Sequence, residues 1–178
     1  MIKRTAIVIL FSVITFTLFA QSIKYRVETT GTYATEETPP TWHLSNRQGL
    51  SGDDAGFAYM RAGLGGDYKF KKSDFSLAWG ADVVVAEGLT SKLFIQQAFA
   101  DLNWKIFTLS MGQKERWGEL KNHRLSTGAL VESGNARPIP QIRIETPEYY
   151  DFFGTNEWFK IRGHVAYGWF SDGDWQQN

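Results

Sequence analysis

Apolar and polar residues alternate along this chain in stretches long enough to cross a membrane as β-strands. In the first stretch, Ile23 and Tyr25 fall on one face of a strand and Lys24 falls on the other. The same period of two runs through residues 22–35, 57–70, 75–85, 98–104, 107–112 and 159–170. A transmembrane strand needs about 9–11 residues, whereas strands of soluble proteins average about five or six. The longer stretches therefore favour a barrel in lipid over a soluble sandwich.

The connections between these stretches support the same fold. Phe70 and Phe75 lie on one apolar face on either side of a four-residue loop, and Trp104 and Phe107 do so around Lys105-Ile106, so both hairpins close in register. Aromatic side chains also recur at the ends of the apolar faces, as they do in the interface girdles of outer-membrane barrels. These residues are Tyr25, Tyr68, Phe70, Phe75, Trp104, Phe107 and Trp169.

Short turns alternate with longer connections, which is typical of outer-membrane barrels. The turns at residues 71–74 and 105–106 are short, the one at 87–92 is intermediate, and residues 36–56 form a long connection. With the N-terminus in the periplasm, the long segments would be extracellular or folded into the lumen. Residues 115–157, rich in Gly, Pro, Asn, Arg and Glu, are expected to be a long loop or lumen plug. Whether residues 139–145 add a strand, which would reverse the direction of 159–170, stays open.

The first twenty residues predict a secretory signal peptide. Lys3 and Arg4 precede an uncharged run at 5–19 that ends at Ala20. The alternative is a membrane anchor, but a spanning helix needs about 20 apolar residues and this run is shorter. Residues 21–178 would then be the N-terminal part of an outer-membrane barrel. Single-chain barrels have at least about eight strands, so the chain is expected to be an incomplete fragment of one.

Composition excludes several classes of function. Nineteen basic residues balance nineteen acidic ones, so a nucleic-acid partner is not expected. Cysteine is absent, which excludes disulfides, cysteine metal ligands and a cysteine nucleophile. None of the three histidines lies in a metal motif, and no G-x-S-x-G nucleophile elbow occurs. We therefore expect no metal, no cofactor and no enzyme activity.

Several stretches resemble the capsule assembly Wzi family of outer-membrane proteins. They are PTWHLSNRQGL at 40–50, FIQQAFADL at 94–102, GQKERWGELKN at 112–122, SGNARPIPQIR at 133–143 and RGHVAYGWFSDGDWQ at 162–176. The resemblance implies a plugged barrel of about eighteen strands, within the range known for such barrels. It also implies an outer-membrane lectin that binds capsular polysaccharide and helps to assemble or attach the capsule. Its partners would be that polysaccharide, outer-membrane lipid and other capsule export components, with the chain itself a monomer.

Sugar binding calls for flat aromatic faces, with amide, carboxylate and arginine partners for hydroxyl and acid groups. The irregular segments contain both kinds of residue, and the candidates are Trp42, Arg47, Lys114, Glu115, Arg116, Trp117, Glu119, Asn135, Arg137, Gln141 and Arg143. The competing interpretation for each is a lumen network that fixes a plug to the barrel wall, since polar lumens are general in this architecture. Four inward-facing strand residues are expected in such a network: Arg61, Asp82, Asp101 and Arg162.

Two other functions stay open. A porin-like channel would need only the barrel. An outer-membrane hydrolase could use Glu115 and Glu119 as a carboxylate pair of the glycosidase kind, although the sequence does not show how far apart they lie.

Overall fold

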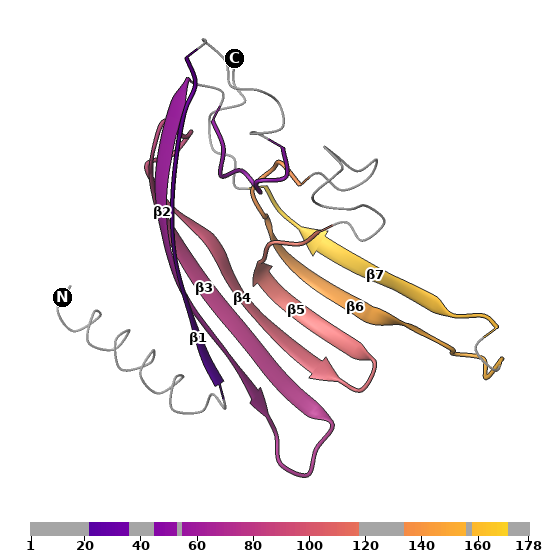
Figure 1. Ribbon diagram of the computed structural model, residues 1–178. Helices are drawn as coiled ribbons and strands as arrows, with labels where there is room; N and C mark the ends of the chain where they lie inside the picture. The colour runs from indigo at the N-terminus through magenta and orange to yellow at the C-terminus, as the bar shows by residue number, and fades with distance from the viewer. Residues whose placement is uncertain (1–21, 36–44, 53–54, 118–133, 156–157, 171–178) are drawn as a thin grey trace.

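The described part of the chain is one antiparallel β-sheet. The computed structural model describes residues 22–35, 45–52, 55–117, 134–155 and 158–170. Neighbouring strands follow one another in chain order, with every pair antiparallel (Figure 1). The seven strands are β1 (Ser22–Tyr33), β2 (Gly56–Lys69), β3 (Phe75–Glu87), β4 (Leu93–Trp104), β5 (Phe107–Gln113), β6 (Pro140–Tyr150) and β7 (Ile161–Gly168). The predicted all-β antiparallel class is confirmed. The predicted signal peptide lies outside the described residues, within which no helix is long and apolar enough to cross a membrane.

The sheet has two unlike ends. At the end where β1 begins, the turns at 70–74 and 105–106 are short, and the β6–β7 connection spans residues 151–160. We call this the turn end. At the opposite end, the loop end, the connections span residues 34–55, 88–92 and 114–139. The predicted hairpins close as expected, because Trp104 pairs with Phe107 and the Phe70 amide donates to the Phe75 carbonyl at 3.1 Å.

Strand β6 corrects one expectation. Residues 115–157 were expected to be a loop or plug, with a strand at 139–145 left open, and the structure shows that Pro140–Tyr150 pairs with β5 on one side and β7 on the other. The alternation of Ile142 and Ile144 with Arg143 and Glu145 makes this segment a strand of the sheet. The open question of direction is thereby answered, since β7 runs from the turn end to the loop end.

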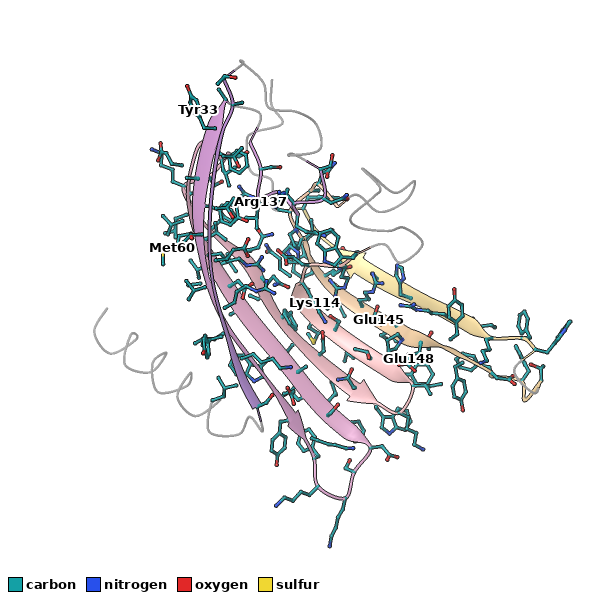
Figure 2. All side chains as sticks on the ribbon, viewed as in Figure 1. Tyr33, Met60, Lys114, Arg137, Glu145 and Glu148 are labelled. Atoms are coloured by element: carbon teal, nitrogen blue, oxygen red, sulfur yellow. The ribbon has the colours of Figure 1, made fainter. Side chains whose placement is uncertain are left out.

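Polar and apolar side chains occupy the faces of this sheet in the reverse of the usual order. On the outer face, Tyr25, Met60 and Val165 are 84%, 52% and 79% exposed. On the inner face, the charged Arg61 and Asp101 are only 3% and 5% exposed. Figure 2 shows Met60 on the outer side of the curved sheet and Lys114 and Arg137 on the inner side. A soluble sheet would expose its charges and bury its apolar face.

A small apolar cluster holds a connecting segment against the inner face near the loop end. Leu50 packs with Phe57, Tyr59, Val84 and Ala86, all of which are at most 6% exposed. Residues 45–52, drawn in purple, therefore lie against the sheet beside the start of β6 (Figure 1). This cluster places the first connection over the polar residues of β2, β3 and β4.

A bulge in β4 turns two adjacent side chains inward. Asp82 pairs with Gln97 but Val83 pairs with Ile95, so Gln96 is an extra residue in the ladder. Bulges redirect side chains in this way. Gln96 has no exposed surface, and Gln97 makes contacts on the same face.

Candidate functional site

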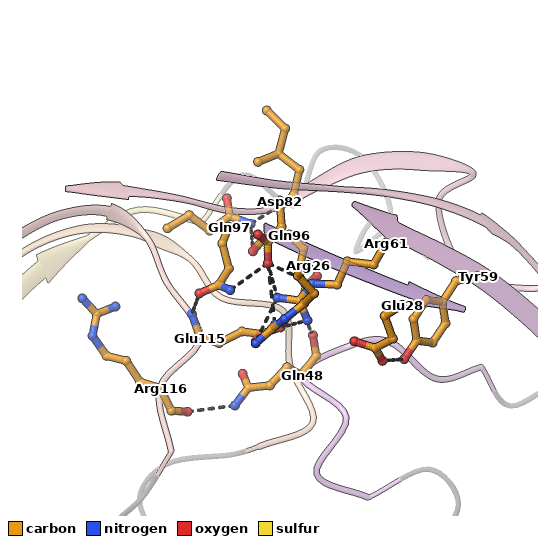
Figure 3. A network of polar contacts seen from close by, with 12 residues as sticks. Arg26, Glu28, Gln48, Tyr59, Arg61, Asp82, Gln96, Gln97, Glu115 and Arg116 are labelled. Carbon is orange, nitrogen blue, oxygen red and sulfur yellow. Dashed lines mark hydrogen bonds and ion pairs between the residues drawn. The ribbon is translucent and has the colours of Figure 1, made fainter. Parts of the chain in front are cut away.

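A charged cluster lies at the centre of the inner face. Arg61 of β2 contacts two carboxylates: its Nε donates to Asp82 of β3 at 2.9 Å, and its Nη1 lies 3.0 Å from Glu115 Oε1. Arg26 of β1 approaches Asp82 at 3.9 Å. Two cations thus meet two anions, and the cluster is neutral (Figure 3). Arg61 and Asp82, both predicted as lumen residues, are brought together here.

Two glutamines of the β4 bulge complete this cluster. Gln97 donates to Asp82 at 2.9 Å and accepts from the Glu115 amide at 3.0 Å. Gln96 donates to Glu115 Oε1 at 2.9 Å and to the Gln48 carbonyl at 2.8 Å. The bulge therefore ties both irregular segments, 45–52 and 114–117, to the sheet (Figure 3).

Sequence reasoning missed Gln48, Gln96 and Gln97. A signal for the bulge was present, because the outward-facing Ile95 and Ala98 are three residues apart, which breaks the period of two. For Gln48 no such signal exists. Its burial and its positive φ of 54° follow from contacts with residues far along the chain.

The other charged residues that follow β5, Lys114 and Arg116, also contact the sheet. Lys114 forms an ion pair with Asp101 of β4 and lies 4.7 Å above the Phe99 ring. Arg116 donates to Ser110 Oγ at 2.6 Å, and its carbonyl accepts from Gln48 at 2.8 Å. Lys114, Glu115 and Arg116 were candidates for sugar binding, yet the structure places all three in contacts that hold this segment against the sheet.

Two irregular segments, residues 45–52 and the residues from 134 that precede β6, contact each other above the charged cluster. The Gln48 amide donates to the Gly134 carbonyl at 2.7 Å, and the Asn46 amide donates to Asn135 Oδ1 at 2.6 Å. Gly49 has a φ of 76°, and a Cβ there would lie 2.4 Å from Arg137 Cγ, so only glycine allows this approach. The candidates Arg47, Asn135 and Arg137 are thereby brought onto one surface.

Arg137 is a partly buried cation without an acidic partner among the described residues. Its guanidinium stacks 3.7 Å from the centre of the Phe94 ring and donates to Ser91 Oγ at 3.3 Å. Neither Arg137 nor the exposed Arg47 lies within 4 Å of a carboxylate in the part of the chain that the structure describes. Burial lowers the pKa of the Arg137 guanidinium, because desolvation disfavours its charged form.

The other predicted residues lie apart. Trp117 is 38% exposed at the end of the described segment after β5. On β6, Gln141 pairs with Gly168 of β7, and Arg143 donates to Glu145 at 2.6 Å. Arg162 of β7 lies 5.9 Å from the Tyr149 ring. Trp42 and Glu119 lie outside the described residues.

Comparisons of the chain with protein-family models, characterised proteins and solved structures found no significant match. The resemblance to the Wzi family therefore stays a prediction. Within the described ranges, no group of three or more His, Cys, Asp or Glu side chains gathers to hold a metal ion.

Proposed function

We propose that this chain is part of an outer-membrane β-barrel that binds an acidic surface polysaccharide and helps to hold it on the cell. The observation that carries the proposal is a contrast in charge pairing on the inner side of the sheet. Arg61, Asp82 and Glu115 neutralise one another, whereas Arg47 and Arg137 have no carboxylate within reach among the described residues. Paired charges support structure, and unpaired arginines favour an anionic ligand.

Arginine suits the acid group of a sugar. Its planar guanidinium binds a carboxylate through two parallel hydrogen bonds, and it is always charged. Arg137 is held by Phe94 and Ser91, so little side-chain entropy is lost when a ligand binds it. The neutral cluster beneath it holds segments 45–52 and 114–117 in place, and that positions the arginines. This arrangement supports the lectin role that the Wzi resemblance implies.

The outer face supports placement in a membrane. Val27, Val85, Ile95, Ile144 and Val165 are between 55% and 79% exposed, which would be unfavourable for a sheet in water. The strands β1 to β4 and β6 have 11 to 14 residues, enough to span a bilayer as tilted strands. In the proposal, further strands close the barrel and lipid covers this face.

The test is binding of an acidic probe by the purified chain. We expect it to bind polygalacturonate and not neutral dextran. Arg137→Gln should weaken binding about 10- to 150-fold, the value of one charge-assisted contact. The matched control is Arg26→Gln, because Arg26 is a partly exposed arginine that faces Asp82. Equal binding of both polymers, or equal losses in the two variants, would contradict the proposal.

A test in cells addresses the capsule itself. Deletion of the gene should release capsular polysaccharide into the medium at unchanged total synthesis, and Arg137→Gln should reproduce this loss. Unchanged attachment in the deletion strain would favour the porin-like alternative, which conductance in planar bilayers would then test. The segments packed on the inner face favour binding over an open pore, because they occupy space that a channel would need.

A further inference from the structure

Three lysines converge at the turn end of the sheet. Lys71 and Lys72 lie in the β2–β3 turn and Lys105 lies in the β4–β5 turn. The two turns line one open hollow of about 660 Å³, whose walls include Phe75 and Trp104. Lys69 and Asp74 line the hollow as well, so residues from two separate hairpins form a single surface with an excess of basic side chains.

These lysines are not explained by ion pairing or by turn geometry. Lys71, Lys72 and Lys105 are exposed, and none has a carboxylate within 4 Å among the described residues. Lys72 and Lys105 have φ values of 60° and 51°, in the left-handed region where glycine or asparagine is favoured. In both turns, a lysine thus occupies a position whose backbone conformation favours glycine.

An aromatic row lies directly above the lysines. Phe75, Trp104 and Phe107 follow one another across β3, β4 and β5, and Phe152 of the β6–β7 connection continues the row, with ring centres 5.9, 6.4 and 6.4 Å apart. Each of the four is 38–44% exposed on the outer side. Lys105 Nζ lies 5.5 Å from the centre of the Trp104 ring. Aromatic rings in this position lie at the level of lipid headgroups, and lysines below them meet the phosphates.

We infer that Lys71, Lys72 and Lys105, with the ring of Trp104, form a binding surface for anionic phospholipid headgroups. The inference rests on the membrane placement of the proposed function, but not on polysaccharide binding. The ligand is the phosphate of a lipid whose chains lie against the aromatic row. A free phosphate would use the lysines alone and gain nothing from the exposed rings. With β1 beginning in the periplasm, this surface meets the inner leaflet.

The experiment measures lipid preference through Trp104. The chain is folded into phosphatidylcholine vesicles that contain either brominated phosphatidylglycerol or brominated phosphatidylcholine, and tryptophan quenching is compared with that of Trp104→Phe. A lysine near an anionic surface contributes a factor of about five in binding, so Lys71→Ser/Lys72→Ser/Lys105→Ser should lower the preference by up to about a hundredfold. The corresponding triple arginine variant should retain it. Lys92→Ser is the control, because Lys92 pairs with Glu87 at the loop end.

The outcomes separate the two proposals. Stronger quenching by phosphatidylglycerol in the native chain and the arginine variant, with loss in the serine variant, supports the inference. Equal quenching by both lipids overturns it and leaves the membrane placement standing, since quenching itself requires insertion. Absence of quenching by either lipid overturns both. Loss of the preference on adding inorganic phosphate at constant ionic strength would indicate a free-phosphate site and overturn the lipid assignment.

Discussion

Replacement of Arg61 by methionine should destabilise the protein more than any other single change in the inner cluster. Arg61 is 3% exposed and neutralises two carboxylates, Asp82 and Glu115, whose side chains are 10% and 13% exposed. Methionine fills much of the same volume but leaves two buried anions facing each other, with only Arg26 nearby at 3.9 Å from Asp82. Breaking a buried pair in this way costs about 3–5 kcal/mol.

Substitution of Glu115, the partner of Arg61, is expected to lower the free energy of unfolding by less. Glu115→Gln keeps the shape of the side chain, and Arg61 retains its contact with Asp82, so we expect a loss of about 1–3 kcal/mol. In the double variant Arg61→Met/Glu115→Gln, Asp82 is the one carboxylate of the pair that still loses its contact with Arg61. The combined loss should therefore fall short of the sum of the single losses by about 0.5–3 kcal/mol.

The assay is urea unfolding in detergent micelles, followed by tryptophan fluorescence. The matched control is the Lys92–Glu87 pair, in which the side chains are 79% and 77% exposed. The cycle Lys92→Met with Glu87→Gln should give a coupling below about 1 kcal/mol, as exposed pairs do. If Arg61→Met lowers the free energy of unfolding by no more than Lys92→Met does, the charges on the inner face are as well solvated as those on the surface. That result would refute a buried neutral cluster.

Three further changes test the sheet and its attachments by the same unfolding assay. Gly112→Ala should cost about 2 kcal/mol or more, because φ is 105° and the new Cβ would lie 2.2 Å from the Ala98 carbonyl; Gly163→Ala, with no atom within 4 Å, should be near neutral. Gln96→Leu should cost about 2 kcal/mol, because it removes one of the donors to Glu115 and the side-chain donor to the Gln48 carbonyl. Limited proteolysis should then cleave segment 45–52 faster, and unchanged cleavage would show that Gln96 does not hold this segment. Trp104→Ala should cost about 1–3 kcal/mol by ending two ring contacts, and a loss below 0.5 kcal/mol would show that the row is not packed.

Much of the sheet could be predicted from the order of residues alone. Neighbouring residues of a strand lie on opposite faces. The faces of Ile23, Lys24 and Tyr25 relative to one another can therefore be predicted without any knowledge of the rest of the chain. Loop length sets which residues pair across a short hairpin, and the pairing of Trp104 with Phe107 follows from it. The extent of β6 was harder to predict, because Pro140 and Pro147 interrupt an otherwise regular pattern.

The candidate site could be predicted only as a set of residue types. Sequence reasoning placed Glu115 among sugar-binding candidates and Arg61 among lumen residues, without a way to join them. Arg61 and Glu115 are 54 residues apart, and Gln48 and Arg116 are 68 apart. Whether a charged side chain is neutralised or free depends on such distant partners, which no local pattern records.

The alternation by itself therefore determined that this chain forms long antiparallel strands with an apolar face and a charged face, because side-chain direction along a strand is a local property. Only the tertiary structure decided which of the inward-facing charges meet, so that Arg61 is paired with Asp82 and Glu115 while Arg137 has no carboxylate partner among the described residues. The physical reason is that burial and charge compensation are set by the curvature of the sheet and by segments packed on it from far along the chain.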